Sequence, residues 1–188
     1  MDNRTRILEE ALALFSARGY DAVGIQEVAE AAGVTKPTLY HYFNSKRGLL
    51  DALLEVNFTA LLQAVRPAAD YHHDLVLSLE QTARAYFGFA REHPQFYRIQ
   101  LALYFAPPDS EPYQAVTRYN LEQHHLLEEL FAGAAQDHGN LRGRQRAYAA
   151  TFLGMLNTYI GLYLNGYAVL DDELVYHAVH QFMHGIFA

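Results

Sequence analysis

Apolar side chains recur at spacings of three and four residues along almost the whole chain. No stretch alternates apolar and polar residues as a half-buried strand does. The first apolar stripe places Ile7, Ala11, Leu14 and Phe15 on one side of a helix, and Gly19 ends that helix. The pattern predicts an all-α chain of about nine helices.

Three short helices are expected within residues 1–48. Gly24 opens the second helix, and Gly33 ends it because glycine adopts the positive φ that a tight turn requires. Thr35 then caps the third helix, and Asn44 ends it. A second, larger domain is expected over 49–188.

Longer helices are expected in this second domain. A fourth helix is marked by leucines from Leu49 onward and stops at Pro67, and further breaks lie at Pro94 and at Pro107. The later helices are expected at 74–92, 94–105, 110–136, 142–169 and 172–187.

The second and third helices, joined by a short turn that contains glycine, have the layout of a helix-turn-helix. Val28, Leu39 and Phe43 are expected to fix the angle between the two helices. The polar and aromatic side chains left on the outer side of the third helix are suited to a DNA major groove: Lys36, Thr38, Tyr40, His41 and Tyr42.

The net charge of the chain argues against DNA binding, but the distribution of charge along the chain does not. A net charge of −7 disfavours nucleic acid as a partner, because phosphate neutralisation carries much of DNA affinity. Residues 1–48 hold six basic and six acidic residues, so the whole excess of negative charge lies in 49–188. The chain's two lysines, Lys36 and Lys46, bracket the third helix and leave a local basic footprint.

The N-terminal quarter of the chain resembles the DNA-binding domain of the TetR family. The resemblance covers many positions that occur in order and at fixed spacing: Ile7, Ala11, Leu14-Phe15, Gly19-Tyr20, Ile25, Val28-Ala29, Ala32-Gly33-Val34, Thr35-Lys36-Pro37-Thr38-Leu39-Tyr40, Tyr42-Phe43, Lys46 and Leu49-Leu50. One departure is Gly24, where many relatives have Thr or Ser. Glycine caps a helix almost as well, so the cost is a few tenths of a kcal/mol.

The resemblance implies roles for residues of this domain. Side chains implied to face bases are Gln26, Lys36, Thr38 and His41, and side chains implied to hold phosphates are Tyr40, Tyr42 and Lys46, beside the capping Thr35. We therefore expect a homodimeric repressor that binds a palindromic operator and leaves it when a small molecule binds.

A stripe of small side chains runs along the segment Ala147–Leu170, which carries no charge. Its members follow one helical face and allow another helix to approach closely: Gly154, Thr158, Gly161 and Asn165. The last helix offers Val175, Val179 and Phe182 as partners, and two helices from each subunit would form a four-helix dimer interface. The alternative is that the stripe packs inside its own subunit.

Aromatic residues are more numerous than a helical core requires, with fourteen Tyr and eleven Phe. Buried tyrosine hydroxyls need polar partners, so a ligand pocket lined by rings is expected, and its ligand would be a small apolar or aromatic molecule. The residues expected to line it are Tyr86, Tyr104, Tyr119, Phe152 and Tyr159. The alternative is a fully packed aromatic core.

Metal and membrane interpretations are weaker. His177, His180 and His184 share a face of the last helix, but Gln181 stands where a zinc-protease helix has its catalytic Glu. Ala147–Leu170 is long enough to cross a bilayer, yet polar residues and tyrosines are spread along it, which favours a helix buried in protein. We therefore expect no metal site, cofactor or membrane partner.

Two other classes of function remain open. One is a small helical enzyme or metal-binding bundle without a DNA function, although no phosphate loop, nucleophile motif or complete metal set supports it. The other is a membrane-attached interaction protein. The absence of cysteine and of a signal segment at the N-terminus favours a cytoplasmic protein. The missing catalytic motifs favour a protein that is not an enzyme. Salt-sensitive binding to a palindromic duplex would separate the regulator from both alternatives.

Overall fold

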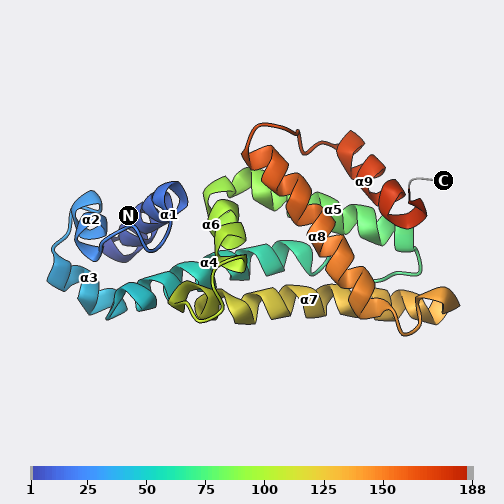
Figure 1. Cartoon of the computed structure of the whole chain (residues 1–188), viewed down its shortest axis with the longest axis horizontal. Helices are drawn as coiled ribbons and strands as arrows, with labels where there is room; N and C mark the ends of the chain where they lie inside the picture. Colours follow the sequence, from blue (N-terminus) through green and yellow to red (C-terminus); the bar gives the residue numbers. More distant parts are fainter. Residues whose placement is uncertain (1, 186–188) are drawn as a thin grey trace. The chain divides into compact units, whose positions relative to one another are not determined.

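The computed structural model describes residues 2–185, and the part it describes is built from helices without strands (Figure 1). The all-α class predicted from the apolar spacing is confirmed. Nine α-helices and one 3₁₀ turn occur within residues 2–185: α1 (Asn3–Arg18), α2 (Ile25–Ala31), α3 (Lys36–Phe43), α4 (Lys46–Val65), α5 (Leu75–Glu92), α6 (Pro94–Tyr104), α7 (Glu111–Asp137), η1 (Gly139–Leu141), α8 (Gln145–Leu164) and α9 (Asp172–His184).

The helix α8 is shorter than the range 142–169 expected from the sequence. It ends because Gly166 adopts a φ of +78°, and the Gly166 amide donates to the carbonyl oxygen of Tyr163 at 2.9 Å. At the other end, Gly143 has a φ of +75° and separates η1 from the helix. Apolar residues continue past Gly166, so the apolar pattern overestimated the length at the C-terminal end of the helix. The expected end of the last helix at 187 lies outside the described residues.

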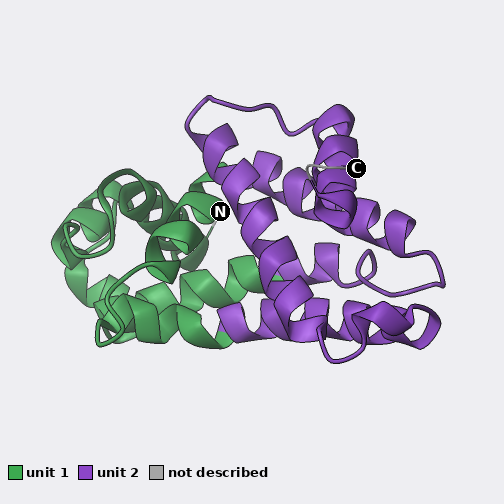
Figure 2. Cartoon of the chain, turned by 45° about the vertical axis from the view of Figure 1, so that its right-hand side comes forward, with its two compact units in different colours: residues 1–59, 94–118 green, residues 60–93, 119–188 purple. Residues whose placement is uncertain are grey.

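The chain forms two compact units (Figure 2). The first consists of residues 1–59 and 94–118, and the second consists of residues 60–93 and 119–188. Both α4 and α7 begin in the first unit and end in the second. The expected domain boundary at residue 48 follows the end of the three N-terminal helices, and it stays a prediction.

The first unit holds α2 and α3 at a fixed angle over α1. Ile7, Ala11 and Leu39 have no exposed surface, so one apolar seam joins α1 to both helices. Gly33 has a φ of +62° in the turn between α2 and α3, as the sequence predicts. The amide of Val34 donates to the Ala29 carbonyl at 2.9 Å, which closes the end of α2.

The join between α3 and α4 is tight. Asn44 adopts a φ of +61°, and the Ser45 hydroxyl oxygen accepts the Gly48 amide at 2.9 Å. A Cβ atom on Gly48 would lie 2.0 Å from the carbonyl oxygen of Phe43. Only glycine therefore permits α4 to begin this close to the end of α3, which fixes the direction in which α4 leaves α3.

The second unit has an aromatic core. Tyr86 and Phe87 of α5 are fully or almost fully buried. The ring of Phe152 on α8 lies 6.3 Å from Phe131 of α7 and 5.1 Å from Phe182 of α9, measured between centroids. These edge-to-face and tilted contacts hold α7, α8 and α9 together within this unit.

Within residues 2–185, one helix has the length and apolar composition needed to cross a membrane. It is α4 (Lys46–Val65), rather than the segment Ala147–Leu170 that the sequence suggested for this test. Leu50, Leu54 and Phe58 of α4 are fully buried. A buried core helix satisfies the same criteria, so this observation is weak support for a membrane span.

Candidate functional site

The first turn of α3 carries polar groups held by local hydrogen bonds. The Thr35 hydroxyl oxygen accepts the Thr38 amide at 3.3 Å, and the two threonine hydroxyl oxygens lie 2.8 Å apart. Lys36 is exposed, and its ammonium nitrogen lies 5.7 Å from the centre of the Tyr40 ring. The structure thus brings Thr35, Lys36, Thr38 and Tyr40 together from the N-cap to the middle of α3.

Exposed aromatic rings occupy the other half of α3. Tyr40 and Tyr42 are 38% and 40% exposed, and the exposed His41 ring lies 5.6 Å from the Tyr42 ring in an edge-to-face contact. Leu39 and Phe43, on the same helix, are buried in the core of the unit. This anchoring makes α3 a rigid platform for amphipathic side chains whose polar tips face water.

Gln26 lies on α2 rather than α3. Its side chain is exposed, and the amide nitrogen donates to the Glu30 carboxylate at 2.7 Å. The Gly24 cap that departs from the family pattern is supported by Glu27, whose carboxylate accepts the Gly24 amide at 2.9 Å. This bond and the Arg18 guanidinium hold the pKa of Glu27 below its usual range. Half of a capping box therefore replaces the missing Thr or Ser.

Lys46 begins α4 and is half-buried. Its ammonium nitrogen lies 4.2 Å from the centre of the Tyr20 ring, a distance at which a cation is attracted to the ring face. The Tyr20 hydroxyl donates to the carboxylate of Glu111. Burial and this carboxylate raise the pKa of Tyr20, so the phenol remains protonated. No local sequence pattern predicts the cluster of Tyr20, Lys46 and Glu111, because Glu111 lies 91 residues after Tyr20.

The residues expected to line a ligand pocket are divided between the two units. Tyr86, Tyr119 and Phe152 are buried and belong to the second unit, whereas Tyr104 is half-buried and belongs to the first. The Tyr86 hydroxyl has no hydrogen-bond partner although the side chain is fully buried, and burial raises its pKa. Tyr159 is half-buried and borders a hollow of about 470 Å³ on α8 and α9.

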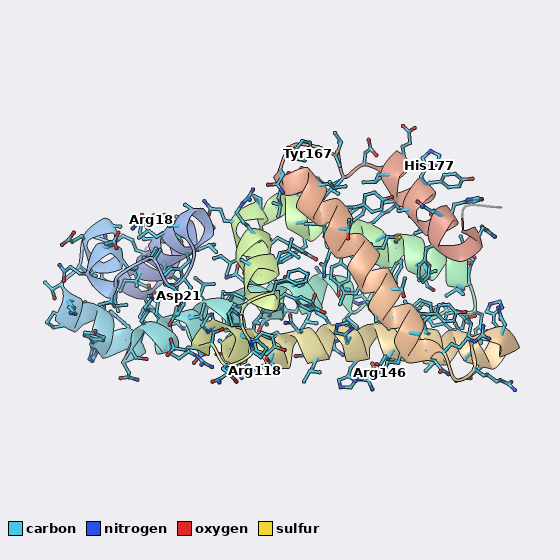
Figure 3. All side chains as sticks on the ribbon, in the orientation of Figure 1. Arg18, Asp21, Arg118, Arg146, Tyr167 and His177 are labelled. Atoms are coloured by element: carbon cyan, nitrogen blue, oxygen red, sulfur yellow. The ribbon has the colours of Figure 1, made fainter. Side chains whose placement is uncertain are left out.

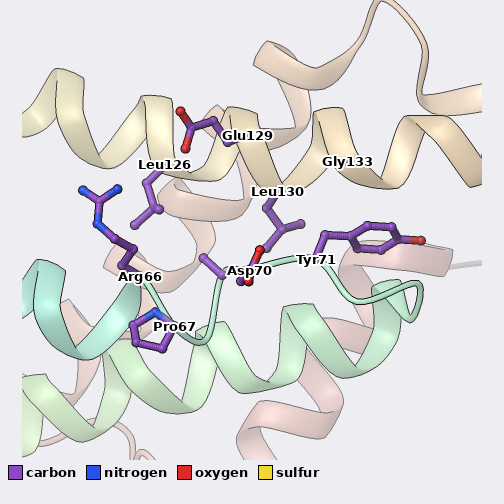
Figure 4. A pocket seen from close by; sticks show the side chains of 9 residues that line it. Arg66, Pro67, Asp70, Tyr71, Leu126, Glu129, Leu130 and Gly133 are labelled. Atoms are coloured by element: carbon purple, nitrogen blue, oxygen red, sulfur yellow. The ribbon is translucent and has the colours of Figure 1, made fainter.

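A second hollow, of about 380 Å³, lies between the α4–α5 connection and α7 (Figure 4). Arg66, Asp70 and Glu129 line it together with the apolar side chain of Leu130. The sequence analysis did not anticipate this hollow. The one available signal was Gly133 inside a helical pattern, because a Cβ atom there would lie 3.1 Å from Tyr71.

The residues expected at a dimer interface separate into two groups. Those of the small stripe on α8 face solvent or are half-buried: Gly154, Thr158, Gly161 and Asn165. Val175 and Val179 of α9 are 2% and 1% exposed, so they pack within their own subunit, and Phe182 is half-buried. A Cβ atom on Gly154 would meet no atom within 4 Å, so the stripe leaves open space along α8.

The three histidines of α9 lie on its exposed side. The rings of His180 and His184 are 4.6 Å apart, and Tyr176 stacks 5.9 Å from His180. His177 projects from the same helix, and Tyr167 projects from the α8–α9 connection (Figure 3). Among residues 2–185, no three side chains of metal-binding type gather to hold an ion.

Comparison with known proteins identifies the N-terminal domain. Residues 7–53 match the model of the family described as bacterial regulatory proteins, tetR family. The HTH-type transcriptional activator FasR of Mycolicibacterium smegmatis is 37% identical over 98 residues, which cover 52% of this chain and 45% of FasR. The chain thus matches less than half the length of this curated relative.

Two solved structures share the fold of almost the whole chain. A FadR regulator from Bacillus subtilis in complex with stearoyl-CoA gives a TM-score of 0.81 at 17% identity, over 97% of this chain and 98% of that one. AibR, in complex with isovaleryl coenzyme A and operator DNA, gives 0.76 at 23% identity, over 99% and 100%. These identities support the fold alone. Residues 7–53 therefore form a domain that matches the tetR family of bacterial regulatory proteins.

Proposed function

We propose that this protein is a ligand-responsive transcription regulator that binds operator DNA as a homodimer, and that it acts as a repressor. The observation that carries the proposal is the exposed set of Lys36, His41 and Tyr42 on α3, a helix anchored by buried Leu39 and Phe43. A rigid helix of this kind fits the major groove and presents donors to base edges.

The roles of the side chains follow from their positions. Lys36, Thr38 and His41 of α3 would contact base edges, with Gln26 of α2 joining them if its amide leaves Glu30. The contacts to phosphates would come from the hydroxyls of Tyr40 and Tyr42 and from the Lys46 ammonium group at the start of α4. The region around Thr35 would add to them. Contacts to phosphates position the protein on the duplex, but they do not read its base sequence.

A homodimer supplies what one recognition helix lacks. One short helix reads too few base pairs for a specific operator, whereas two helices related by a two-fold axis read two half-sites. The exposed stripe of Gly154 and Thr158 on α8 offers the close approach that such a pairing needs. Buried Val175 and Val179 would support the interface from beneath, and the half-buried Phe182 would contribute at its edge.

The effector is proposed to bind inside the second unit. Tyr86 supports this, because a fully buried hydroxyl without a partner is costly unless a ligand or water meets it. Phe152 and Tyr119 would add apolar walls. FadR and AibR, which share the fold, bind CoA thioesters, so an acyl-CoA is the first class of effector to test, beside the apolar or aromatic molecule expected from the sequence.

A small enzyme or metal-binding bundle without DNA function is the alternative, and it is not favoured. Its motifs are missing from the sequence, and the exposed His180 and His184 have no acidic partner beside them that would complete a metal site within residues 2–185. A DNA-binding regulator acts in the cytoplasm, and we propose that location for this chain.

The first prediction concerns recognition of DNA. Lys36→Ala and His41→Ala should each cost about 1–3 kcal/mol of operator affinity and relax the preferred sequence, because base contacts are lost. Lys46→Ala should weaken binding to all duplexes and reduce the salt slope by about 1. Arg146→Ala, which removes an exposed cation on α8, is the control. Parent-like binding by all three variants, measured by fluorescence anisotropy across a salt series, would contradict the recognition helix.

The second prediction concerns the dimer. Gly154→Trp should leave each subunit folded, because its side chain enters open space, yet it should block close approach of a second α8 and shift the protein toward monomers. Gly139→Trp, at a position equally free of neighbours in η1, is the control and should remain dimeric. Analytical ultracentrifugation decides, and a Gly154→Trp protein that is as dimeric as the parent would place the interface elsewhere.

The third prediction concerns the effector. An acyl-CoA or aromatic compound that binds the second unit should lower operator affinity by about five- to 150-fold, a coupling of roughly 1–3 kcal/mol. Tyr86→Phe should weaken that compound's binding, measured by calorimetry, while the free energy of unfolding stays unchanged or rises because an unpaired hydroxyl is removed. A variant that unfolds more easily and binds the compound normally would show that Tyr86 serves only the core.

A further inference from the structure

Glu111, the first residue of α7, contacts two separate segments that flank the helix-turn-helix. Its carboxylate accepts the Tyr20 hydroxyl, 91 residues earlier in the chain, and its backbone carbonyl accepts Arg47 Nη1 at 3.1 Å. Both partners belong to the same compact unit as the start of α7 (Figure 2). One short turn of α7 therefore anchors the α1–α2 connection and the first turn of α4.

The chain of contacts continues from Tyr20 to Lys46. The Lys46 ammonium nitrogen lies 4.2 Å from the centre of the Tyr20 ring, and only 6% of Tyr20 is exposed. A phenol that donates to a carboxylate has a more electron-rich ring, which attracts a cation more strongly. The carboxylate of Glu111 thus fixes the ring, and the ring restrains an otherwise flexible lysine.

We propose that Glu111 is a positioning residue for DNA binding, which acts through Tyr20 to hold the Lys46 ammonium where it meets a DNA phosphate. This inference rests on the proposed DNA-binding function. A lysine that is already ordered loses less side-chain entropy when it binds, and that saving corresponds to about three- to tenfold in affinity. The hydroxyl-to-carboxylate bond carries the effect, because it adds a directional contact to a ring that otherwise packs edge-to-face on Phe15 at 5.3 Å.

The sign of the effect separates this role from general electrostatics. Removing a carboxylate from an acidic protein should strengthen DNA binding slightly, because repulsion of phosphate falls. The positioning role predicts the opposite for Glu111. Glu129→Ala removes an exposed carboxylate from the same helix and serves as the matched control.

The test is a set of affinity measurements on the full-length protein with a mixed-sequence duplex of about 30 base pairs, or roughly three helical turns. Glu111→Ala and Tyr20→Phe should each weaken binding about three- to tenfold, and the double variant should be no weaker than either. Glu111→Gln, whose amide oxygen still accepts the phenol, should recover most of the affinity. Glu129→Ala should bind as well as the parent or slightly better.

A Lys46→Ala background completes the test. There Tyr20→Phe should leave the affinity unchanged, because the lysine on which it acts is gone, and Glu111→Ala should bind as well as Lys46→Ala alone or slightly better. The positioning role would be overturned if the variants lost the same affinity for DNA with Lys46 and with Lys46→Ala. It would also be overturned if Glu111→Ala bound DNA more tightly in the protein that keeps Lys46. Either result would leave the proposed function intact. A parent protein that binds no duplex would overturn the proposed function itself. Thermal unfolding of each variant excludes loss of the fold as the cause.

Discussion

The tight join between α3 and α4 is the constraint on which the DNA-binding half of the structure depends. Gly48 packs against the Phe43 carbonyl so closely that no side chain fits, and Asn44 takes a left-handed conformation to make the turn. The recognition helix and the start of α4 consequently form one rigid corner. Lys46 begins α4 at that corner, and its ammonium group lies over the Tyr20 ring.

The same corner explains how an acidic protein can present the DNA-binding surface that we propose. The negative charge lies beyond residue 48, whereas Lys36 and Lys46 lie at the two ends of α3. Acidic side chains near this region are engaged: Glu27 with Arg18, and Glu111 with Tyr20. These carboxylates are engaged in hydrogen bonds that stabilise the first unit, so the ammonium groups of Lys36 and Lys46 remain available to phosphate.

Much of the fold follows from the sequence, since apolar spacing, proline breaks and caps such as Thr35 act locally. Helix ends were missed where Gly166 stops α8, because the apolar pattern continues through a residue whose backbone ends the helix. The candidate site was predictable on α3, where a motif covers contiguous residues. Glu111 was not, because pairing between residues 91 positions apart depends on tertiary packing rather than on any local pattern.

The central claim is that two copies of α3 read two half-sites of a palindromic operator. Selection of bound molecules from a random pool of DNA duplexes by the purified protein tests it directly. The account predicts enrichment of an inverted repeat whose half-sites are centred about one helical turn apart, roughly 34–36 Å. A pool that remains random after selection, with binding that does not weaken as salt rises, would contradict the claim.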